Sequence, residues 1–256
     1  MQLLIDIGNT RIKWAFDAGE AMHAPLYATG EVVHRGEPPA AAMAFVAGLE
    51  ESPDAVYAVN VAGPEMEQVL GAVLTERFGL NLQMVRTSGS CGDVSNGYTS
   101  IEQLGTDRWA ALVGAWYLCR RSVVIVDVGT AVTIDLVAAD GHHHGGIIVP
   151  GLDLMRTSLD SDTSDISEFA SNSKRPVSGN DWFGRDTLSA VQRGALFSVR
   201  AVIEQAIEEF AGEGELPAVF LTGGDAGLLQ PLVSVPAEHR PYLVLEGLRF
   251  LIAKGS

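Results

Sequence analysis

The strongest constraint on the fold is a sequence motif that occurs twice in the chain. Its first copy, from Leu3 to Phe16, reads LLIDIGNTRIKWAF, and its second, from Ile125 to Val137, reads IVDVGTAVTIDLV. Each copy is an apolar strand, an Asp-x-Gly turn that contains Thr, and a second strand that runs back. A repeat of this size predicts two related halves built on one α/β plan.

The segments after each copy extend the repeat. In the first half, apolar spacing predicts strands at 3–8, 11–17, 26–33, 55–62 and 82–87, helices at 38–51, 64–78 and 103–119, and a Gly- and Ser-rich loop at 88–99. In the second half it predicts strands at 123–128, 132–138, 146–149 and 218–224, helices at 152–159, 187–210 and 226–233, a polar segment at 161–181 and an apolar segment at 242–253. We therefore predict an N-terminal half, residues 1–119, and a C-terminal half, residues 120–256.

Charge and composition limit the partners of this chain. The formal net charge of -15 disfavours nucleic acid and anionic membrane surfaces, because binding to both depends on basic residues. No apolar run is long enough to cross a membrane, and the first residues enter a strand directly instead of forming a signal peptide. Cys91 and Cys119 have neither metal-ligand spacing nor a disulfide framework, which suits a reducing compartment. We expect a cytoplasmic globular protein.

The two repeated turns have the chemistry of phosphate binding. Glycine lets the backbone approach a ligand closely, successive N–H groups form an anion-binding concavity, and a Thr hydroxyl can donate to a phosphate oxygen. The carboxylates of Asp6 and Asp127 can each hold a metal ion, directly or through water. A single Asp-x-Gly turn is equally an ordinary hairpin. Two copies at matching positions favour a site for a nucleoside triphosphate, and the chain has neither of the common alternative phosphate loops.

A third candidate is the segment QLGTDRWAAL, from Gln103 to Leu112. Asp107 can be a first-turn acid that is favoured by the helix dipole, with Arg108 as its solvated neighbour. Alternatively, the Asp107 carboxylate accepts a proton from an attacking hydroxyl while the Arg108 guanidinium holds a substrate carboxylate or a phosphate. Because phosphoryl transfer depends mainly on positioning and charge stabilisation, the two phosphate turns favour the second interpretation.

Two further motifs allow more than one interpretation. The double glycine in LTGGDAGLL, from Leu221 to Leu229, can contact adenosine or can simply join a strand to a helix. The run His142-His143-His144 lies at a predicted hairpin tip, where neighbouring side chains point in opposite directions and do not easily share a metal ion. For this run we predict a solvated tip.

Paired phosphate hairpins on duplicated halves resemble the phosphotransferases of the actin, hexokinase and Hsp70 class. The order of motifs resembles one family of that class, the type III pantothenate kinases, over nearly the whole chain. The matching segments are DIGNTRIKW (Asp6–Trp14), GTDR (Gly105–Arg108), DVGTAVTID (Asp127–Asp135), GGIIVPGL (Gly145–Leu152), TGGDA (Thr222–Ala226) and LVLEGL (Leu243–Leu248).

The resemblance implies two ribonuclease-H-like halves around a nucleotide cleft. It also implies ATP-dependent phosphorylation of pantothenate to 4'-phosphopantothenate, the first step of coenzyme A biosynthesis. The cofactors implied are Mg²⁺ and a monovalent cation, K⁺ or NH₄⁺, and the implied assembly is a homodimer. Two alternatives remain: a kinase for another small alcohol, and a non-catalytic ATP-binding accessory protein of the same fold.

The resemblance also assigns residues. Asp107 would be the general base, and Asp127 would lie near the monovalent cation. The residues implied to bind ATP are Asp6, Ile7, Gly8, Asn9, Thr10, Arg11, Ile12, Lys13 and Thr130. The residues implied to bind pantothenate are Tyr98, Gly105, Thr106, Asp107, Arg108 and Thr187, where Thr106 stands in place of the family's usual Ala.

Overall fold

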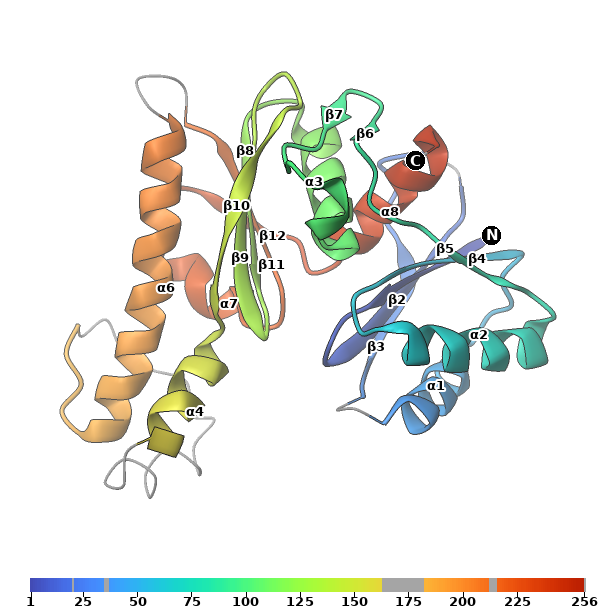
Figure 1. Ribbon diagram of the computed structural model, residues 1–256, viewed down its shortest axis with the longest axis horizontal. Helices are drawn as coiled ribbons and strands as arrows, with labels where there is room; N and C mark the ends of the chain where they lie inside the picture. Colours follow the sequence, from blue (N-terminus) through green and yellow to red (C-terminus); the bar gives the residue numbers. More distant parts are fainter. Residues whose placement is uncertain (20, 35–36, 163–181, 212–215, 256) are drawn as a thin grey trace. The chain divides into compact units, whose positions relative to one another are not determined.

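The computed structural model describes residues 1–19, 21–34, 37–162, 182–211 and 216–255. The chain divides into two compact units (Figure 1). Unit 1 comprises Met1–Ser122, Val137–Gly145 and Tyr242–Ser256, and unit 2 comprises Val123–Leu136 and Gly146–Pro241. Among the described residues, no helix is both long and apolar enough to span a bilayer.

Unit 1 is built on a five-stranded sheet in the order β3-β2-β1-β4-β5. Strands β1, β2 and β3 are antiparallel neighbours, whereas β4 runs parallel to β1 and β5 runs parallel to β4. The strands are β1 (Gln2–Ile7), β2 (Arg11–Asp17), β3 (Tyr27–Val33), β4 (Ala55–Asn60) and β5 (Leu82–Met84), with a separate pair β6 (Ser90–Cys91) and β7 (Val94–Ser95). The helices are α1 (Pro38–Ala47), α2 (Pro64–Phe78), η1 (Ile101–Gln103), α3 (Thr106–Cys119) and α8 (Leu243–Lys254).

Unit 2 repeats this topology. Its sheet has the order β10-β9-β8-β11-β12, which matches the order in unit 1 strand for strand, and β8, β11 and β12 are parallel. The strands are β8 (Val123–Val128), β9 (Ala131–Val137), β10 (His143–Pro150), β11 (Ala218–Thr222) and β12 (Ala237–His239). The helices are α4 (Leu152–Asp162), α6 (Thr187–Ala211), α7 (Ala226–Leu229) and η2 (Gln230–Leu232). The predicted duplication of one α/β plan is confirmed.

The two faces of the unit 1 sheet carry different helices. Alternate residues of β1, Leu3, Ile5 and Ile7, are buried in a core with α1 and α2, which lie side by side in Figure 1. Helices α3 and α8 pack against each other at Gly114 and Gly247, where a side chain on Gly247 would collide with the carbonyl of Ala110. Helix α8 also contacts β1, so this C-terminal helix belongs to the same unit as the first strand.

Several predicted boundaries are wrong for identifiable reasons. Strand β11 ends at Thr222 instead of 224, because Gly223 adopts a φ of +91° and leaves the strand. Strand β10 begins at His143 instead of 146, and the solvated tip predicted for 142–144 is wrong for His143, which is 0% exposed. The short strands β6, β7 and β12 were not predicted. Except for 161–162, the end of α4, the polar segment predicted at 161–181 lies outside the described residues.

A buried ion pair connects the last helix of unit 1 to its second strand. Arg249 of α8 donates from Nε to Oδ2 of Asp17 at 2.9 Å, and these residues are 5% and 4% exposed. The same guanidinium donates from Nη1 to the carbonyls of Met22 and Ala24, at 3.1 and 2.6 Å. The other Asp17 oxygen accepts the N–H of Gly19 at 2.9 Å. One guanidinium therefore fixes both the end of β2 and the loop that follows it.

Replacing Asp17 by Ala leaves the Arg249 guanidinium buried without its counter-charge. We expect the free energy of unfolding, measured by urea titration, to fall by about 3 kcal/mol, because removing one partner of a buried pair exposes the desolvation cost of the other. The matched control is Asp93→Ala, which breaks the pair between Arg120 and Asp93, whose side chains are 52% and 66% exposed. Its expected cost is below about 1 kcal/mol. Equal losses in both variants would contradict this account of the buried pair.

Candidate active site

The first repeated turn, Gly8-Asn9-Thr10, joins β1 to β2 in unit 1. The Gly8 N–H donates to the carbonyl of Arg11 at 3.0 Å, which closes the turn. On the flanking strands Asp6 lies directly opposite Lys13, so the carboxylate and the ammonium group share one face of the sheet. The turn therefore offers backbone N–H groups with a carboxylate and a cation beside them, the groups that a metal–phosphate ligand needs.

The other residues of this segment contribute less. Ile7 and Ile12 are 0% exposed and point into the core, so only their backbone atoms can face a ligand. The Arg11 guanidinium pairs with the Glu31 carboxylate of the neighbouring strand at 2.6 Å, and both side chains are about half exposed.

The carboxyl ends of β1 and β4 meet at the same edge of the sheet, because the two strands are parallel. The Val61 N–H, just past β4, donates to the carbonyl of Ile7 at 3.0 Å. Gly105, at the start of α3, lies beside Val61, since a side-chain carbon on Gly105 would be 3.8 Å from Val61 Cγ1. The first turn and the beginning of α3 therefore occupy one edge of unit 1, the kind of edge at which α/β sheets bind ligands.

Asp107 lies in the first turn of α3 and is half-buried. Its Oδ1 accepts the N–H of Arg108 at 2.7 Å. A side-chain carbon on Gly105 would lie 2.7 Å from the same oxygen, closer than any real contact of that type. The carboxylate can keep this orientation only because position 105 has no side chain.

Arg108, Tyr98 and His143 form a connected row in unit 1. Arg108 is 9% exposed and donates from Nη1 to the Tyr98 hydroxyl at 3.0 Å. The Tyr98 ring stacks on His143, with ring centroids 5.6 Å apart and planes at 15°. The loop below Tyr98 is fixed because Gly97 packs directly on the His143 carbonyl, where a side chain would collide.

The sequence analysis missed the contribution of His143. The available signal was the alternation of a strand, in which one of three adjacent histidines points inward while its neighbours point outward. His142 and His144 are indeed exposed. The structure thus brings together Tyr98 and the Gly105–Arg108 segment, as the resemblance implied, and adds a buried histidine behind the tyrosine.

The hydroxyl group of Thr106 contacts the hydroxyl group of Thr87. The Thr87 hydroxyl donates to the carbonyl of Leu104 at 2.8 Å and can accept from the Thr106 hydroxyl, whose Oγ1 lies 3.4 Å away. The residue that departs from the family's usual Ala therefore joins a hydrogen-bonded support for the start of α3.

The second repeated turn, Gly129-Thr130, joins β8 to β9 in unit 2 and closes in the same way. The Gly129 N–H donates to the carbonyl of Ala131 at 3.1 Å. The Thr130 residue is exposed, and its carbonyl accepts the N–H of Gly151 at 3.0 Å. A side chain on Gly151 would lie 2.5 Å from the Thr130 carbonyl oxygen, so the third strand of this unit ends tightly against the turn.

The double-glycine segment packs against this second turn. A side chain on Gly223 would collide with the Asp127 carboxylate and would lie 2.5 Å from the Val128 carbonyl oxygen. The Asp225 N–H donates to the same Val128 carbonyl at 3.1 Å. Gly223 therefore does more than join a strand to a helix, because its missing side chain makes room for Asp127. Its contact with adenosine stays a prediction.

Thr187 lies at the exposed start of α6 in unit 2, whereas Tyr98 and Arg108 belong to unit 1. The preceding residue, Asp186, caps the helix by accepting the Ser189 N–H at 2.8 Å. That hydrogen bond holds the pKa of the Asp186 carboxyl below its usual range. The structure therefore gives Thr187 a defined position in its own unit, and its part in a pantothenate pocket stays a prediction.

In the part of the chain that the structure describes, no three His, Cys, Asp or Glu side chains gather as a metal site. The candidate carboxylates, Asp6 and Asp127, belong to different units.

Comparisons with known proteins agree on one family. The sequence profile described as Type III pantothenate kinase matches residues 2–209. A Type III pantothenate kinase of Alkalilimnicola ehrlichii is 35% identical over 254 residues, covering 96% of this chain and 95% of the relative. Another, of Azoarcus sp. strain BH72, is 37% identical over 254 residues, covering 99% and 91%.

Solved structures support the fold. A conserved putative Baf family transcriptional activator from Campylobacter jejuni aligns with a TM-score of 0.61 at 18% identity, covering 98% of each chain. A putative 2-dehydro-3-deoxygalactonokinase from Sinorhizobium meliloti aligns with a TM-score of 0.57 at 12% identity, covering 99% of each chain. At these identities the likeness shows the fold alone, and with the repeated strand order it confirms the actin-like ATPase architecture.

Gly223→Ala tests the packing behind the second turn. We expect this variant to lose at least about 1–2 kcal/mol of unfolding free energy, because a left-handed φ is costly for alanine and the new methyl group displaces the Asp127 turn. The matched control is Gly227→Ala in α7, where nothing lies within 4 Å of the added carbon. There we expect no loss, or a gain of about 0.5–1 kcal/mol from helix preference. Urea titration of both variants measures the difference, and an unperturbed Gly223 variant would contradict the packing argument.

Proposed function

Because the chain belongs to the type III pantothenate kinase family, we propose that it transfers the γ-phosphoryl group of ATP to the terminal hydroxyl of pantothenate. The product is 4'-phosphopantothenate, and the reaction is the first step of coenzyme A biosynthesis. The observation that carries the proposal is the position of Asp107. Asp107 lies in the first turn of α3, at the same edge of the sheet as the first repeated turn. A triphosphate bound by that turn would therefore lie near a carboxylate that can accept a proton.

In the proposed mechanism Asp107 orients the pantothenate hydroxyl and accepts its proton as the oxygen attacks phosphorus. Its hydrogen bond from the Arg108 N–H fixes the direction of the carboxylate before the substrate arrives. The Arg108 guanidinium, held by the Tyr98 hydroxyl, would bind the substrate carboxylate, and the tyrosine ring would pack against its apolar part. Gly105 and Thr106 would shape the same end of the pantothenate pocket, and Thr187 would complete it.

For the nucleotide we propose that the first turn binds phosphate oxygens through the backbone of Gly8, Asn9 and Thr10. Lys13 would neutralise phosphate charge, and Asp6 would hold Mg²⁺ through water. Thr130 would join from the second turn, and Asp127 would lie beside a K⁺ or NH₄⁺ ion. When bound, these ions supply charge stabilisation for the triphosphate. The single carboxylates at the two strand ends fit this arrangement, since a metal–triphosphate brings most of its own ligands.

We also propose that the enzyme is a cytoplasmic homodimer, as the family resemblance implies. Two cysteines without a disulfide, Cys91 and Cys119, are compatible with a reducing compartment. Sedimentation equilibrium of the purified chain tests the assembly, and a monomer at assay concentration would overturn it.

Two alternatives set the controls. A kinase for another small alcohol would turn over with that alcohol and not with pantothenate. A non-catalytic ATP-binding protein would bind nucleotide without turnover. The supported orientation of Asp107 and the pairing of Arg108 with Tyr98 favour catalysis, because neither contact is needed for nucleotide binding alone.

We expect purified protein with ATP, Mg²⁺ and pantothenate to release ADP, and potassium or ammonium to raise the rate. The Asp107→Asn variant should lose about 10²–10⁴-fold in kcat, the usual contribution of a general base, while it keeps its affinity for ATP. Glu102→Gln, a nearby exposed acid, is the matched control and should keep full activity. Turnover that is independent of pantothenate, or an active Asp107→Asn variant, would overturn the assignment.

Gly105→Ala should act on the reaction through Asp107. The added methyl group would lie 2.7 Å from Asp107 Oδ1, so the carboxylate must turn away. We expect kcat to fall about tenfold or more while KM for ATP changes little, because a displaced base loses its alignment. Steady-state kinetics with both substrates measure this. A normal kcat would show that the carboxylate reaches its working position without the observed orientation.

A further inference from the structure

His34 lies at the end of β3 and contacts both sides of the first turn. Its backbone N–H donates to the Thr10 carbonyl at 3.0 Å, and its ring Nε2 lies 2.7 Å from the Gly8 carbonyl oxygen. A carbonyl oxygen only accepts, so Nε2 carries the proton and donates. His34 is 6% exposed, and its other ring nitrogen, Nδ1, has no partner among the described residues. The hydrogen bond to Gly8 is therefore the polar contact that this side chain contributes.

This hydrogen bond sets the direction of an N–H group in the turn. In a trans peptide the carbonyl and the following N–H point to opposite sides. Because His34 holds the Gly8 carbonyl toward its imidazole, the Asn9 N–H of the same peptide points to the opposite side, away from His34. An anion-binding turn depends on the directions of its N–H groups.

The two units share one backbone contact to the repeated turn and differ in the side chain at that position. At the corresponding place, just after the third strand, unit 2 has Gly151, whose N–H donates to the Thr130 carbonyl at 3.0 Å. A side chain there would collide with the Gly129 carbonyl. Both units therefore hold the Thr carbonyl of the turn through a backbone N–H, and unit 1, whose turn is longer, adds the contact from the His34 imidazole to the Gly8 carbonyl.

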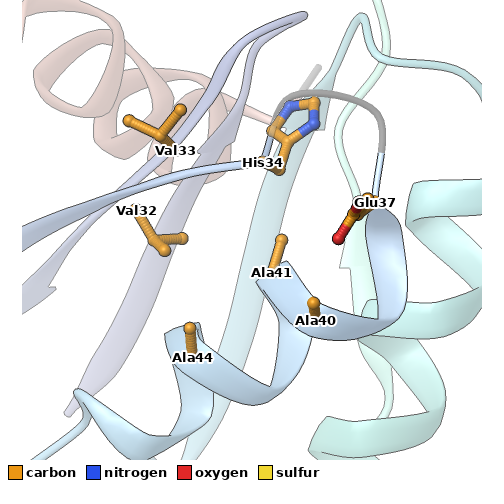
Figure 2. A pocket seen from close by; sticks show the side chains of 7 residues that line it. All are labelled: Val32, Val33, His34, Glu37, Ala40, Ala41 and Ala44. Carbon is orange, nitrogen blue, oxygen red and sulfur yellow. The ribbon is translucent and has the colours of Figure 1, made fainter.

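Figure 2 shows where the ring lies. His34 stands at the edge of a pocket of about 440 Å³ between β3 and α1, with Glu37 beside it and the methyl groups of alanines along the helix below. The ring is one of the groups that line this pocket. A small molecule could therefore reach the space that a shortened side chain would leave.

We propose that His34 is a positioning residue for the first phosphate turn: its Nε2–H holds the Gly8 carbonyl so that the Asn9 N–H faces the terminal phosphates of the nucleotide. This rests on the proposed function only in taking the turn as the phosphate site. The side chain itself touches neither substrate, and it acts through the backbone of Gly8.

The test compares His34→Gln with His34→Leu. Glutamine retains an N–H donor at a similar reach, whereas leucine fills similar volume without a donor. We expect the leucine variant to bind a non-hydrolysable ATP analogue about tenfold more weakly by calorimetry, with AMP binding and KM for pantothenate unchanged. The glutamine variant should stay within about threefold of the unsubstituted protein. A loss of AMP binding equal to the loss of ATP-analogue binding would overturn the proposal, because it would indicate a general disturbance. So would unchanged binding in the leucine variant.

Two controls keep the test decisive. Val33→Ala changes a side chain of the same pocket that is 45% exposed, and it should leave all constants unchanged. If the leucine variant does not fold, His34→Ala is measured with and without free imidazole, which should restore ATP-analogue binding within the same protein; no restoration would overturn the proposal. Because analogue binding is measured without pantothenate, a protein that binds the analogue but does not phosphorylate pantothenate would refute the proposed function, while the comparison of the leucine and glutamine variants would still decide the role of His34.

Discussion

The parallel pairing of β1 with β4 determines where the chemistry of unit 1 can occur. It brings the Gly8–Thr10 turn, at the end of β1, to the same edge of the sheet as Val61, just past β4, and Gly105 at the start of α3 lies beside Val61. Without that pairing, Asp6 and Asp107 would be unrelated acids about a hundred residues apart. With that pairing, a carboxylate that can accept a proton lies at the same edge of the sheet as a turn that can hold phosphate.

Missing side chains are as important to this arrangement as the functional groups. Gly105 leaves room for the Asp107 carboxylate, Gly223 does the same for Asp127, and Gly97 lets the loop of Tyr98 rest on the start of β10. In each case a carboxylate or a ring can keep its orientation because the neighbouring glycine has no side chain. Such positions tolerate substitution less than their size suggests, because even a methyl group would change the direction of a neighbouring functional group.

Much of this could be predicted from the sequence, because several strands of both units are short apolar runs and the turns between them carry Gly and Asp. The duplicated plan was predicted correctly, and Tyr98 lies with the Gly105–Arg108 segment, whose part in binding pantothenate stays a prediction. The sequence could not predict His34, since it becomes important only through its contact with the distant first turn. It also gave no sign of β6, β7 and β12, which are too short to show a period. The apolar segment at 242–253 was found, but its return to the first unit depends on contacts with α3 and β1 that no local pattern encodes.

The return of α8 to unit 1 has a consequence for how the protein is made. A ribosome releases the chain from its N-terminus, so the sheet of unit 1 exists for most of translation without its last helix. During that interval Asp17 lacks the guanidinium that will balance its charge, and the face of α3 that receives Gly247 is uncovered. Unit 1 can therefore be completed only after the final residues emerge, which makes the first-synthesised part of the enzyme among the last to reach its native state.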